Sequence, residues 1–203
     1  MRHSELVRTL ATLELFESPR ADREQVATPP EAAARLLAAA HARGDLEGRS
    51  LLDLGCGPGT LAIGAALLGA GPVRGIDDDA GVLAVARRNA DRTGVEVSFA
   101  CEDVATVTEP ADTVLMNPPF GAQRRHADRP FWDAALTLAR RRVYAFSMAS
   151  SRTFIEERAV ARSASVEATE PVPWELPRTF PHHRKRSVEL SVDLWVLAPA
   201  PRT

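Results

Sequence analysis

From Ser50 onward, short apolar runs alternate with longer amphipathic stretches, a pattern typical of βαβ units in a mainly parallel sheet. Residues 80–93 show it clearly, because positions 82, 83, 85 and 86 are apolar, arginines lie opposite, and Gly94 follows, which predicts a helix. By the same reasoning we expect further helices at residues 60–68, 131–139 and 151–161. We expect strands at residues 50–54, 73–76, 95–100, 112–116, 143–148, 165–169 and 188–197. The pattern therefore predicts an α/β fold.

Two stretches of this core depart from the simple alternation. Residues 95–100 alternate strictly between apolar and polar side chains, which gives a strand with one polar face and favours an edge position in the sheet. Residues 171–186 (PVPWELPRTFPHHRKR) contain so many prolines that we expect no regular structure there.

The first 48 residues have a different pattern. Leu6, Leu10 and Leu13 are spaced to share one helix face, and an alanine-rich helix is expected at residues 31–43, after two prolines. We interpret residues 1–48 as a helical N-terminal extension that packs on a core of residues 49–203. The chain has 203 residues, 45% of them hydrophobic, which is enough for a single domain.

The composition excludes some classes of protein. A formal net charge of −2 gives no global basic field, so any contact with nucleic acid needs a local patch. The N-terminus lacks the apolar core of a signal peptide, and glycines interrupt the longest apolar run, so we expect a soluble, cytoplasmic protein with no membrane contact. Cys56 and Cys101 lie far apart with no partner at metal-ligand spacing, which argues against disulfides and metal sites and predicts two small buried side chains.

A glycine-rich turn between the first strand and the first helix is the first candidate binding element. Gly55, Gly57 and Gly59 let the backbone approach a ligand closely, and the helix N-terminus offers free N–H groups. Asp53 precedes the turn, and Asp77 ends the second strand, where a carboxylate can accept hydrogen bonds from two ribose hydroxyls. This arrangement suits NAD and S-adenosylmethionine alike, but the GxGxG spacing lacks the last glycine of the dinucleotide fingerprint and favours a ligand without a pyrophosphate.

Two residues after the third strand extend the same site. Asp103 is placed to accept a hydrogen bond from an adenine amine. Val104 follows it and could donate its backbone N–H to the adenine ring. Both lie at the carboxyl end of a strand, where ligands of open α/β sheets bind.

The segment MNPPFG (residues 116–121) follows the fourth strand and carries the candidate catalytic groups. The side-chain oxygen of Asn117 and the carbonyl of Pro118 are two acceptors that can hold both N–H groups of a planar amine and orient its lone pair toward a methyl donor. Phe120 offers a ring on which a base can stack. Pro118 and Pro119 stiffen the segment, because proline fixes its own φ and cannot join a sheet ladder.

The segments LLDLGCGPGT, GIDDDA and MNPPFG resemble motifs of S-adenosylmethionine-dependent methyltransferases that act on amino groups. More specifically, the chain resembles the methyltransferase-like protein five family and its archaeal relatives over nearly its whole length. The resemblance rests on four segments in the same order and spacing: QVATPPEAAARLL, LGCGPGTLAIGAALLGAG, MNPPFGAQRRHADRPFWDAAL and LPRTFPHHRKRSVELSVDL.

The resemblance implies a seven-stranded, Rossmann-like class I methyltransferase, with a mainly parallel sheet and an antiparallel last strand. It implies methylation of the exocyclic amine of one adenosine in small-subunit ribosomal RNA, with S-adenosylmethionine as the cofactor. It also implies a small zinc-binding activator subunit that pairs with an edge strand. By position, the cofactor contacts of the family match Gln25, Thr28, Asp53, Gly55, Gly57, Asp77, Asp103, Val104 and Asn117, and its catalytic motif matches Asn117, Pro118, Pro119 and Phe120.

A basic cluster in the proline-rich segment is the candidate RNA-binding element. Its side chains can hold phosphates, and arginine can do so with two parallel hydrogen bonds. The cluster consists of His182, His183, Arg184, Lys185 and Arg186, with Arg124 and Arg125 as weaker candidates.

Three other functions remain open on the sequence alone. An Asn-Pro-Pro-aromatic motif also suits a glutamine amide, so the substrate could be a translation release factor. DNA adenine methylation is a further alternative, although the chain lacks room for a separate target-recognition domain. A non-catalytic ribosome-assembly factor could retain the same cofactor pocket.

Overall fold

The computed structural model of the chain describes residues 1–16, 25–121, 126–177 and 187–200. Its α-helices are α1 (His3–Leu10), α2 (Pro30–Ala42), α3 (Thr60–Leu67), α4 (Ala80–Thr93), α5 (Arg129–Leu138) and α6 (Arg152–Ala161), with short 3-10 helices η2 (Val104–Thr106) and η3 (Ala149–Ser151). Its strands are β1 (Leu51–Leu54), β2 (Val73–Asp77), β3 (Ser98–Cys101), β4 (Ala111–Met116), β5 (Ala139–Met148), β6 (Ser165–Val172), β7 (Glu175–Pro177), β8 (Ser187–Glu189) and β9 (Val192–Ala198).

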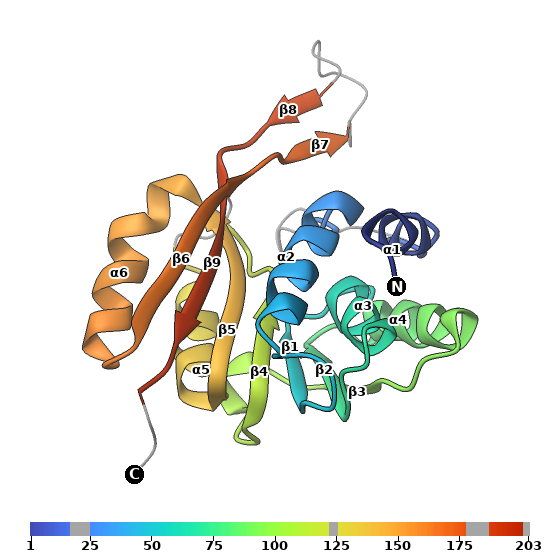
Figure 1. Cartoon of the computed structure of the whole chain (residues 1–203), viewed down its shortest axis with the longest axis horizontal. Coiled ribbons are helices and arrows are strands. Elements are labelled where there is room, and N and C mark those ends of the chain that lie inside the picture. Colours follow the sequence, from blue (N-terminus) through green and yellow to red (C-terminus); the bar gives the residue numbers. More distant parts are fainter. Residues whose placement is uncertain (17–24, 122–125, 178–186, 201–203) are drawn as a thin grey trace.

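The main sheet has seven strands in the order β3-β2-β1-β4-β5-β9-β6 (Figure 1). The pairs from β3 to β5 are parallel, whereas β9 runs antiparallel to both β5 and β6. The expected mainly parallel sheet with an antiparallel last strand is therefore confirmed. The chain reverses direction across the sheet between β3 and β4, so the carboxyl ends of β1 and β4 meet at the switch point where open α/β sheets bind ligands.

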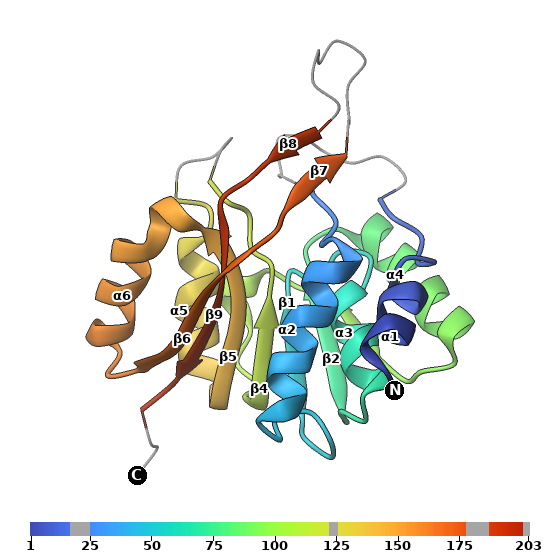
Figure 2. The same ribbon diagram turned by 45° about the horizontal axis from the view of Figure 1, so that its top comes forward.

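Helices cover both faces of this sheet (Figures 1 and 2). Alternate residues of β5 show the division, because Tyr144 and Phe146 join the hydrophobic cluster that includes α1 to α3, whereas Val143 and Ala145 join the cluster with α5 and α6. A strand whose two faces are both covered is apolar throughout, as β5 is over these four positions.

The N-terminal segment is helical and packs on the first of these clusters. Leu6 and Leu10 of α1 and Leu36 and Leu37 of α2 are almost fully buried. Leu6 and Leu10 thus form the buried face of α1, as predicted, whereas Leu13 is buried but lies beyond the end of the helix. The helices of residues 1–48 share one core with the sheet.

Three expectations about individual elements were wrong. The third strand begins at Ser98 rather than at residue 95, because the N–H of Val95 donates to Ala90 and completes the end of α4. The last predicted strand is divided into β8 and β9, which a break at Leu190 separates. Cys101 is exposed on the edge strand β3, whereas Cys56 is buried as expected.

The proline-rich stretch also contains regular structure, contrary to the prediction. Residues 175–177 form β7, which pairs with β8 through Leu176 opposite Val188. Proline is tolerated because this two-stranded ribbon consists of edge strands and Pro177 is the last residue of β7. Figure 2 shows that the ribbon continues β6 and β9 beyond the main sheet. The basic cluster of residues 182–186 lies outside the described residues.

None of the described helices combines the length and the apolar character that a membrane span requires. Within the described ranges, no group of three or more His, Cys, Asp or Glu side chains is arranged to hold a metal ion.

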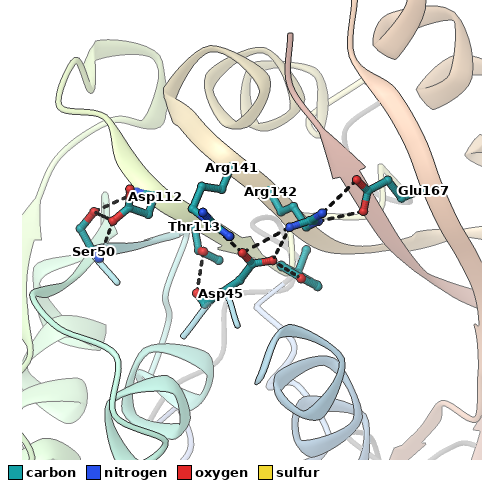
Figure 3. Close-up of polar contacts among 8 residues, drawn as sticks. Asp45, Ser50, Asp112, Thr113, Arg141, Arg142 and Glu167 are labelled. Atoms are coloured by element: carbon teal, nitrogen blue, oxygen red, sulfur yellow. Dashed lines mark hydrogen bonds and ion pairs between the residues drawn. The ribbon is translucent and has the colours of Figure 1, made fainter. Parts of the chain in front are cut away.

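A buried carboxylate, that of Asp45, lies beside the amino ends of β4 and β5 (Figure 3). Asp45, just after α2, is fully buried and accepts hydrogen bonds from Arg141 Nε at 2.9 Å, Arg142 Nη1 at 3.1 Å and the Tyr144 hydroxyl at 2.7 Å. Burial and this bond to the carboxylate raise the pKa of Tyr144 above its ordinary value.

Two further contacts extend this group, which we call the Asp45 cluster: Asp45, Thr113, Arg141, Arg142, Tyr144 and Glu167. The Thr113 hydroxyl donates to the backbone carbonyl of Asp45 at 2.7 Å. The Arg142 guanidinium also donates to both oxygens of Glu167, at 2.8 and 3.1 Å. The cluster joins the end of α2 to three strands, β4, β5 and β6, and leaves both Asp45 oxygens hydrogen-bonded.

Candidate active site

A cleft of about 680 Å³ lies at the carboxyl ends of β1, β2 and β4. It brings together all nine residues proposed from the sequence as cofactor contacts, although these come from segments up to 92 positions apart, Gln25 and Asn117 being the outermost. The residues that line the cleft include Phe16, Gln25, Thr28, Asp53, Gly55, Gly57, Asp77, Asp103, Val104, Asn117, Pro119 and Phe131.

The glycine turn adopts a backbone that side chains would strain. Gly55, Gly57 and Gly59 have φ values of 68°, 52° and 89°, all in the left-handed region. A Cβ on Gly55 would lie 2.7 Å from Cε1 of Phe131, and one on Gly57 would lie 3.1 Å from Cζ of Phe16. The glycines are therefore needed both for the turn and for the close approach of two aromatic rings, which the sequence analysis missed.

Asp77 supports this turn from the end of β2. Its Oδ2 accepts the N–H of Gly57 at 3.0 Å, and its Oδ1 accepts the N–H of Asp79 at 3.0 Å. Burial raises the pKa of Asp77, and the two backbone N–H groups oppose that rise because they stabilise the ionised form. Asp77 thus has a structural role in addition to the ribose contact proposed for it.

Among the acids of the cleft, Asp53 has the large shift in pKa. Its side chain is 1% exposed, and its Oδ2 accepts the N–H of Ala62, in the first turn of α3, at 3.0 Å. The other oxygen, Oδ1, has no hydrogen-bond partner among the described residues. Burial and the negative charge of Asp77 raise the pKa of Asp53 to about 7, against the pull of the Ala62 N–H.

Asp103 and Val104 lie at the next strand end. Asp103 caps the 3-10 helix η2, because its Oδ1 accepts the N–H of Ala105 at 2.8 Å. Val104 is the first residue of that helix and packs in the same hydrophobic cluster as Phe131. An apolar wall beside a carboxylate suits a flat ring that carries an amine, and the contacts of Asp103 and Val104 with adenine stay a prediction.

The N-terminal segment reaches the cleft at two points. Gln25 Nε2 donates to Oδ2 of Asp79 at 3.0 Å, and the hydroxyl of Thr28 accepts from Nδ2 of Asn117 at 3.0 Å. Gln25 and Thr28 therefore line the cleft, where they hydrogen-bond to residues that follow β2 and β4.

A buried asparagine ties this segment to the glycine turn. Asn89 of α4 is fully buried, accepts the N–H of Glu14 at 2.8 Å and donates to the carbonyl of Glu14 at 3.0 Å. It also donates to the carbonyl of Pro58, inside the glycine turn, at 3.0 Å. One carboxamide thus joins Glu14, two positions before the cleft residue Phe16, to the glycine turn. No sequence signal marked it, because its partners lie 75 and 31 positions away.

Asn117 presents an unused acceptor to the cleft. One N–H of its NH₂ group donates to the Thr28 hydroxyl, which leaves the side-chain oxygen as the acceptor of this carboxamide. That oxygen is buried and has no partner among the described residues. A buried acceptor without a donor is costly, so an unsatisfied oxygen in a cleft indicates a place where a ligand donor binds.

Of the proposed catalytic residues, only Asn117 and Pro119 are among those that line the cleft, whereas Pro118 and Phe120 are not. Pro118 is buried. The ring of Phe120 packs edge-on against Trp174 with 5.7 Å between the ring centroids. Trp174 is fully buried, which gives it a core position and not that of an exposed stacking platform. Arg124, Arg125 and the basic cluster of residues 182–186 lie outside the described residues.

The comparisons with known proteins agree with this geometry. The chain matches the model of the Methyltransferase small domain family over residues 29–143. The rRNA N(6)-adenosine-methyltransferase METTL5 of Danio rerio is 32% identical over 206 residues, which cover 98% of this chain and 100% of that protein. An uncharacterized protein of Methanocaldococcus jannaschii is also 32% identical, over 96% of this chain and 92% of its own.

A solved structure is similar over the same extent. A proposed RNA methyltransferase from Pyrococcus horikoshii shares 35% sequence identity, covers 98% of both chains and has a TM-score of 0.91. The N-terminal helices, the seven-stranded sheet and the residues of the cleft all fall within the aligned length. The chain belongs to the Methyltransferase small domain family and, within it, to the METTL5 family of rRNA N(6)-adenosine-methyltransferases.

Proposed function

We propose that this protein transfers a methyl group from S-adenosylmethionine to the exocyclic amine of an adenosine in small-subunit ribosomal RNA. The observation that carries the proposal is the unpaired, buried oxygen of Asn117, held at the end of β4 beside the glycine turn. Without the glycine turn, an unpaired buried oxygen would indicate only imperfect packing. Without the oxygen, the glycine turn would indicate only a site for some nucleotide. Together they support a site for a cofactor and an amine.

The residues of the cleft fit S-adenosylmethionine. The glycine turn permits close approach of its amino-acid portion, Asp77 can accept from its ribose, and Asp103 with Val104 can hold its adenine. Asp53 and Asp77 are two carboxyl groups at this end of the cleft, and a cationic ligand favours their ionised forms. When bound, S-adenosylmethionine supplies an electrophilic methyl group on a sulfonium.

The chain's own contribution is to orient the acceptor amine. The Asn117 oxygen and the Pro118 carbonyl accept the two N–H groups, which directs the nitrogen lone pair out of the plane of the base. These fixed dipoles become more favourable as positive charge develops on nitrogen, and holding the reacting atoms in line lowers the barrier further. Because the amine becomes acidic as the methyl group is transferred, the proton can leave to water without a strong base.

The substrate side of the site follows from the same segment. Phe120 provides the ring for stacking the target base, and such contacts contribute roughly 1–3 kcal/mol toward the cost of extruding a nucleotide. We assign the phosphate contacts to His182, His183, Arg184, Lys185 and Arg186 on the basis of their charge and their place in the sequence between β7 and β8.

Three further parts of the proposal concern the setting of the enzyme. The whole chain, residues 1–203, acts as one methyltransferase domain, since its N-terminal helices share the core of the sheet. An activator subunit pairs with β3, whose four residues form one edge of the main sheet. The reaction takes place in the cytoplasm, where ribosomal subunits are available.

The deciding experiment maps N(6)-methyladenosine in the small-subunit ribosomal RNA of the host with and without this gene. One site that disappears on deletion and returns with the wild-type gene, but not with an Asn117→Ala variant, supports the proposal. An unchanged map refutes it.

A second experiment separates the alternatives. Purified ribosomal subunits and release factors are incubated with the protein and methyl-labelled S-adenosylmethionine. Label in RNA supports the proposal, whereas label in a release factor identifies a glutamine methyltransferase. If calorimetry detects no binding of S-adenosylmethionine at near-millimolar concentration, with or without its partner, the protein is a non-catalytic factor.

A further inference from the structure

Three aromatic rings form a row from the catalytic segment into the core. Phe120 lies 5.7 Å from Trp174 at an interplanar angle of 62°, and Trp174 lies 5.0 Å from Phe146 of β5 at 68°. Both contacts are edge-to-face, which is the arrangement that the quadrupoles of aromatic rings favour. Phe120 is only partly buried, whereas Trp174 and Phe146 are fully buried. Trp174 therefore stands between a fixed strand and the ring of the MNPPFG segment.

Trp174 also holds the base of the β7–β8 ribbon. It lies in the two-residue link between β6 and β7, and its carbonyl accepts the N–H of Leu190 at 3.0 Å, just before β9. The two strands that leave the main sheet are thus joined at the residue that contacts Phe120. This is the ribbon that carries the basic segment.

The side chain of Trp174 contributes to its surroundings through the packing of its indole ring. Its N–H is buried and has no hydrogen-bond partner in the described part of the chain. The contacts of this side chain that the structure shows are therefore those of its ring, with Phe120 and Phe146. A smaller side chain would leave the Phe120 ring without its support on one side.

We infer that Trp174 is a positioning residue that fixes the ring of Phe120 for the target adenine and couples that ring to the RNA-binding ribbon. The inference rests on the proposed function, because it needs Phe120 to stack the base. The backbone of the segment is already stiffened by two prolines, but the ring can still rotate about its side-chain torsions. Contact with Trp174 removes that freedom, which matters because small misplacements of a reacting group cost large factors in rate.

The molecule contains a matched control on the other face of the sheet. Trp132 and Trp195 form a second edge-to-face pair, with 6.5 Å between centroids, and both rings are fully buried. Trp195 belongs to the cluster with α5 and α6, and its N–H donates to the Ser147 hydroxyl at 2.8 Å. Replacing Trp195 therefore removes a ring of the same size and a hydrogen bond as well, at a place outside the cleft.

The test compares Trp174→Leu with Trp195→Leu, using small-subunit ribosomal RNA of the host transcribed in vitro. We expect kcat of Trp174→Leu to fall by about 10- to 100-fold, while calorimetry shows unchanged affinity for S-adenosylhomocysteine. Trp195→Leu should lower the melting temperature at least as much but keep the kcat of the folded protein. Trp174→Phe, which retains a ring, should recover most of the rate.

A second measurement keeps this inference separate from the proposed function. NMR of protein with labelled phenylalanine rings reports the Phe120 signals directly, and the indole ring current should shift them in the wild type and not in Trp174→Leu. If the wild-type protein methylates no RNA, the proposed function fails. If Trp174→Leu keeps the wild-type kcat, or if its Phe120 signals match the wild type, the role of Trp174 is refuted.

Discussion

Two groups of buried polar side chains lie at opposite ends of β4, and they differ in how many of their oxygens have hydrogen-bond partners. At the amino end, both oxygens of the buried Asp45 accept hydrogen bonds from arginine or tyrosine. At the carboxyl end, one oxygen of Asp53 and the oxygen of Asn117 are buried without a partner among the described residues. The same strand therefore separates polar groups that stabilise the fold from polar groups that are kept for a ligand.

The electrostatics differ in the same way. In the Asp45 cluster, hydrogen bonds to Glu167 and the charge of Asp45 raise the pKa of Arg142 above its ordinary value, so this guanidinium stays protonated at every physiological pH. In the cleft, burial raises the pKa of Asp53 to about 7, so its charge depends on conditions and on what binds nearby. The guanidinium of Arg142, which is paired, therefore keeps its charge as the pH changes. The carboxyl group of Asp53, which has one oxygen that no described residue pairs, changes its charge near neutral pH.

The largest expected effect is on the rate, at the carboxyl end. Asn117→Ala removes the acceptor that orients the amine, and loss of one such preorganised group typically costs about 10²- to 10³-fold in kcat. The melting temperature should fall only slightly, because the lost oxygen has no partner among the described residues and the lost NH₂ group makes one hydrogen bond, to Thr28. Single-turnover methylation of ribosomal RNA measures the rate, and a melting curve measures the stability. A variant that retains more than a tenth of the rate would remove Asn117 from the reaction.

The converse effect is expected at the amino end. Asp45→Asn keeps the shape but places an NH₂ group among donors, and breaking a buried ion pair costs about 3–5 kcal/mol. Because the Arg141 and Arg142 side chains are 37% and 25% exposed, we expect a smaller loss, about 2–3 kcal/mol in the free energy of unfolding. Urea denaturation measures it, and kcat per folded molecule should stay unchanged.

Glu167→Gln is the matched control for this prediction. It alters the exposed partner of the same Arg142 and should cost less than about 1 kcal/mol. Equal losses for the two variants would mean that the buried and exposed halves of the cluster contribute alike.

The pH dependence of stability sharpens the comparison further. The pKa of Asp53 rises from its ordinary value of 3.8 to about 7 on folding, so between these values the folded state binds more protons than the unfolded state. The contribution of Asp53 to the free energy of unfolding should therefore fall by about 2 kcal/mol between pH 5 and pH 7. Denaturation of wild type and Asp53→Asn across this range isolates the effect. Parallel pH profiles would contradict it.

Local signals explain the parts of the fold that the sequence predicted well. The helix α4 begins and ends where expected, Ala80–Thr93, because Asp79 caps its first turn and Gly94 takes the left-handed conformation at its end. The cleft was predictable for a related reason: residues that follow parallel strands meet at one edge of the sheet, whatever their distance along the chain.

Contacts between distant segments account for what the sequence did not predict. Asn89, Phe16 and Phe131 looked like ordinary helix or loop residues, and their partners in the cleft become visible only in the folded chain. The β7–β8 pairing was missed because prolines weaken local strand propensity, whereas pairing between the two legs of a ribbon can override it. Propensity is local, but sheet pairing and side-chain packing are not.

The smallest expected effect on kcat concerns the hydrogen bond that orients the Asn117 carboxamide. Thr28→Val removes the acceptor for the Asn117 NH₂ group, one hydrogen bond of 3.0 Å, and keeps the shape of the side chain. A single hydrogen bond is worth about 0.5–1.5 kcal/mol, so kcat should fall about two- to tenfold. Thr28→Ser retains the hydroxyl and should keep the wild-type rate, measured in the same single-turnover assay. A Thr28→Val rate equal to that of Thr28→Ser would show that the carboxamide is oriented without this bond, by the packing of the prolines that follow it.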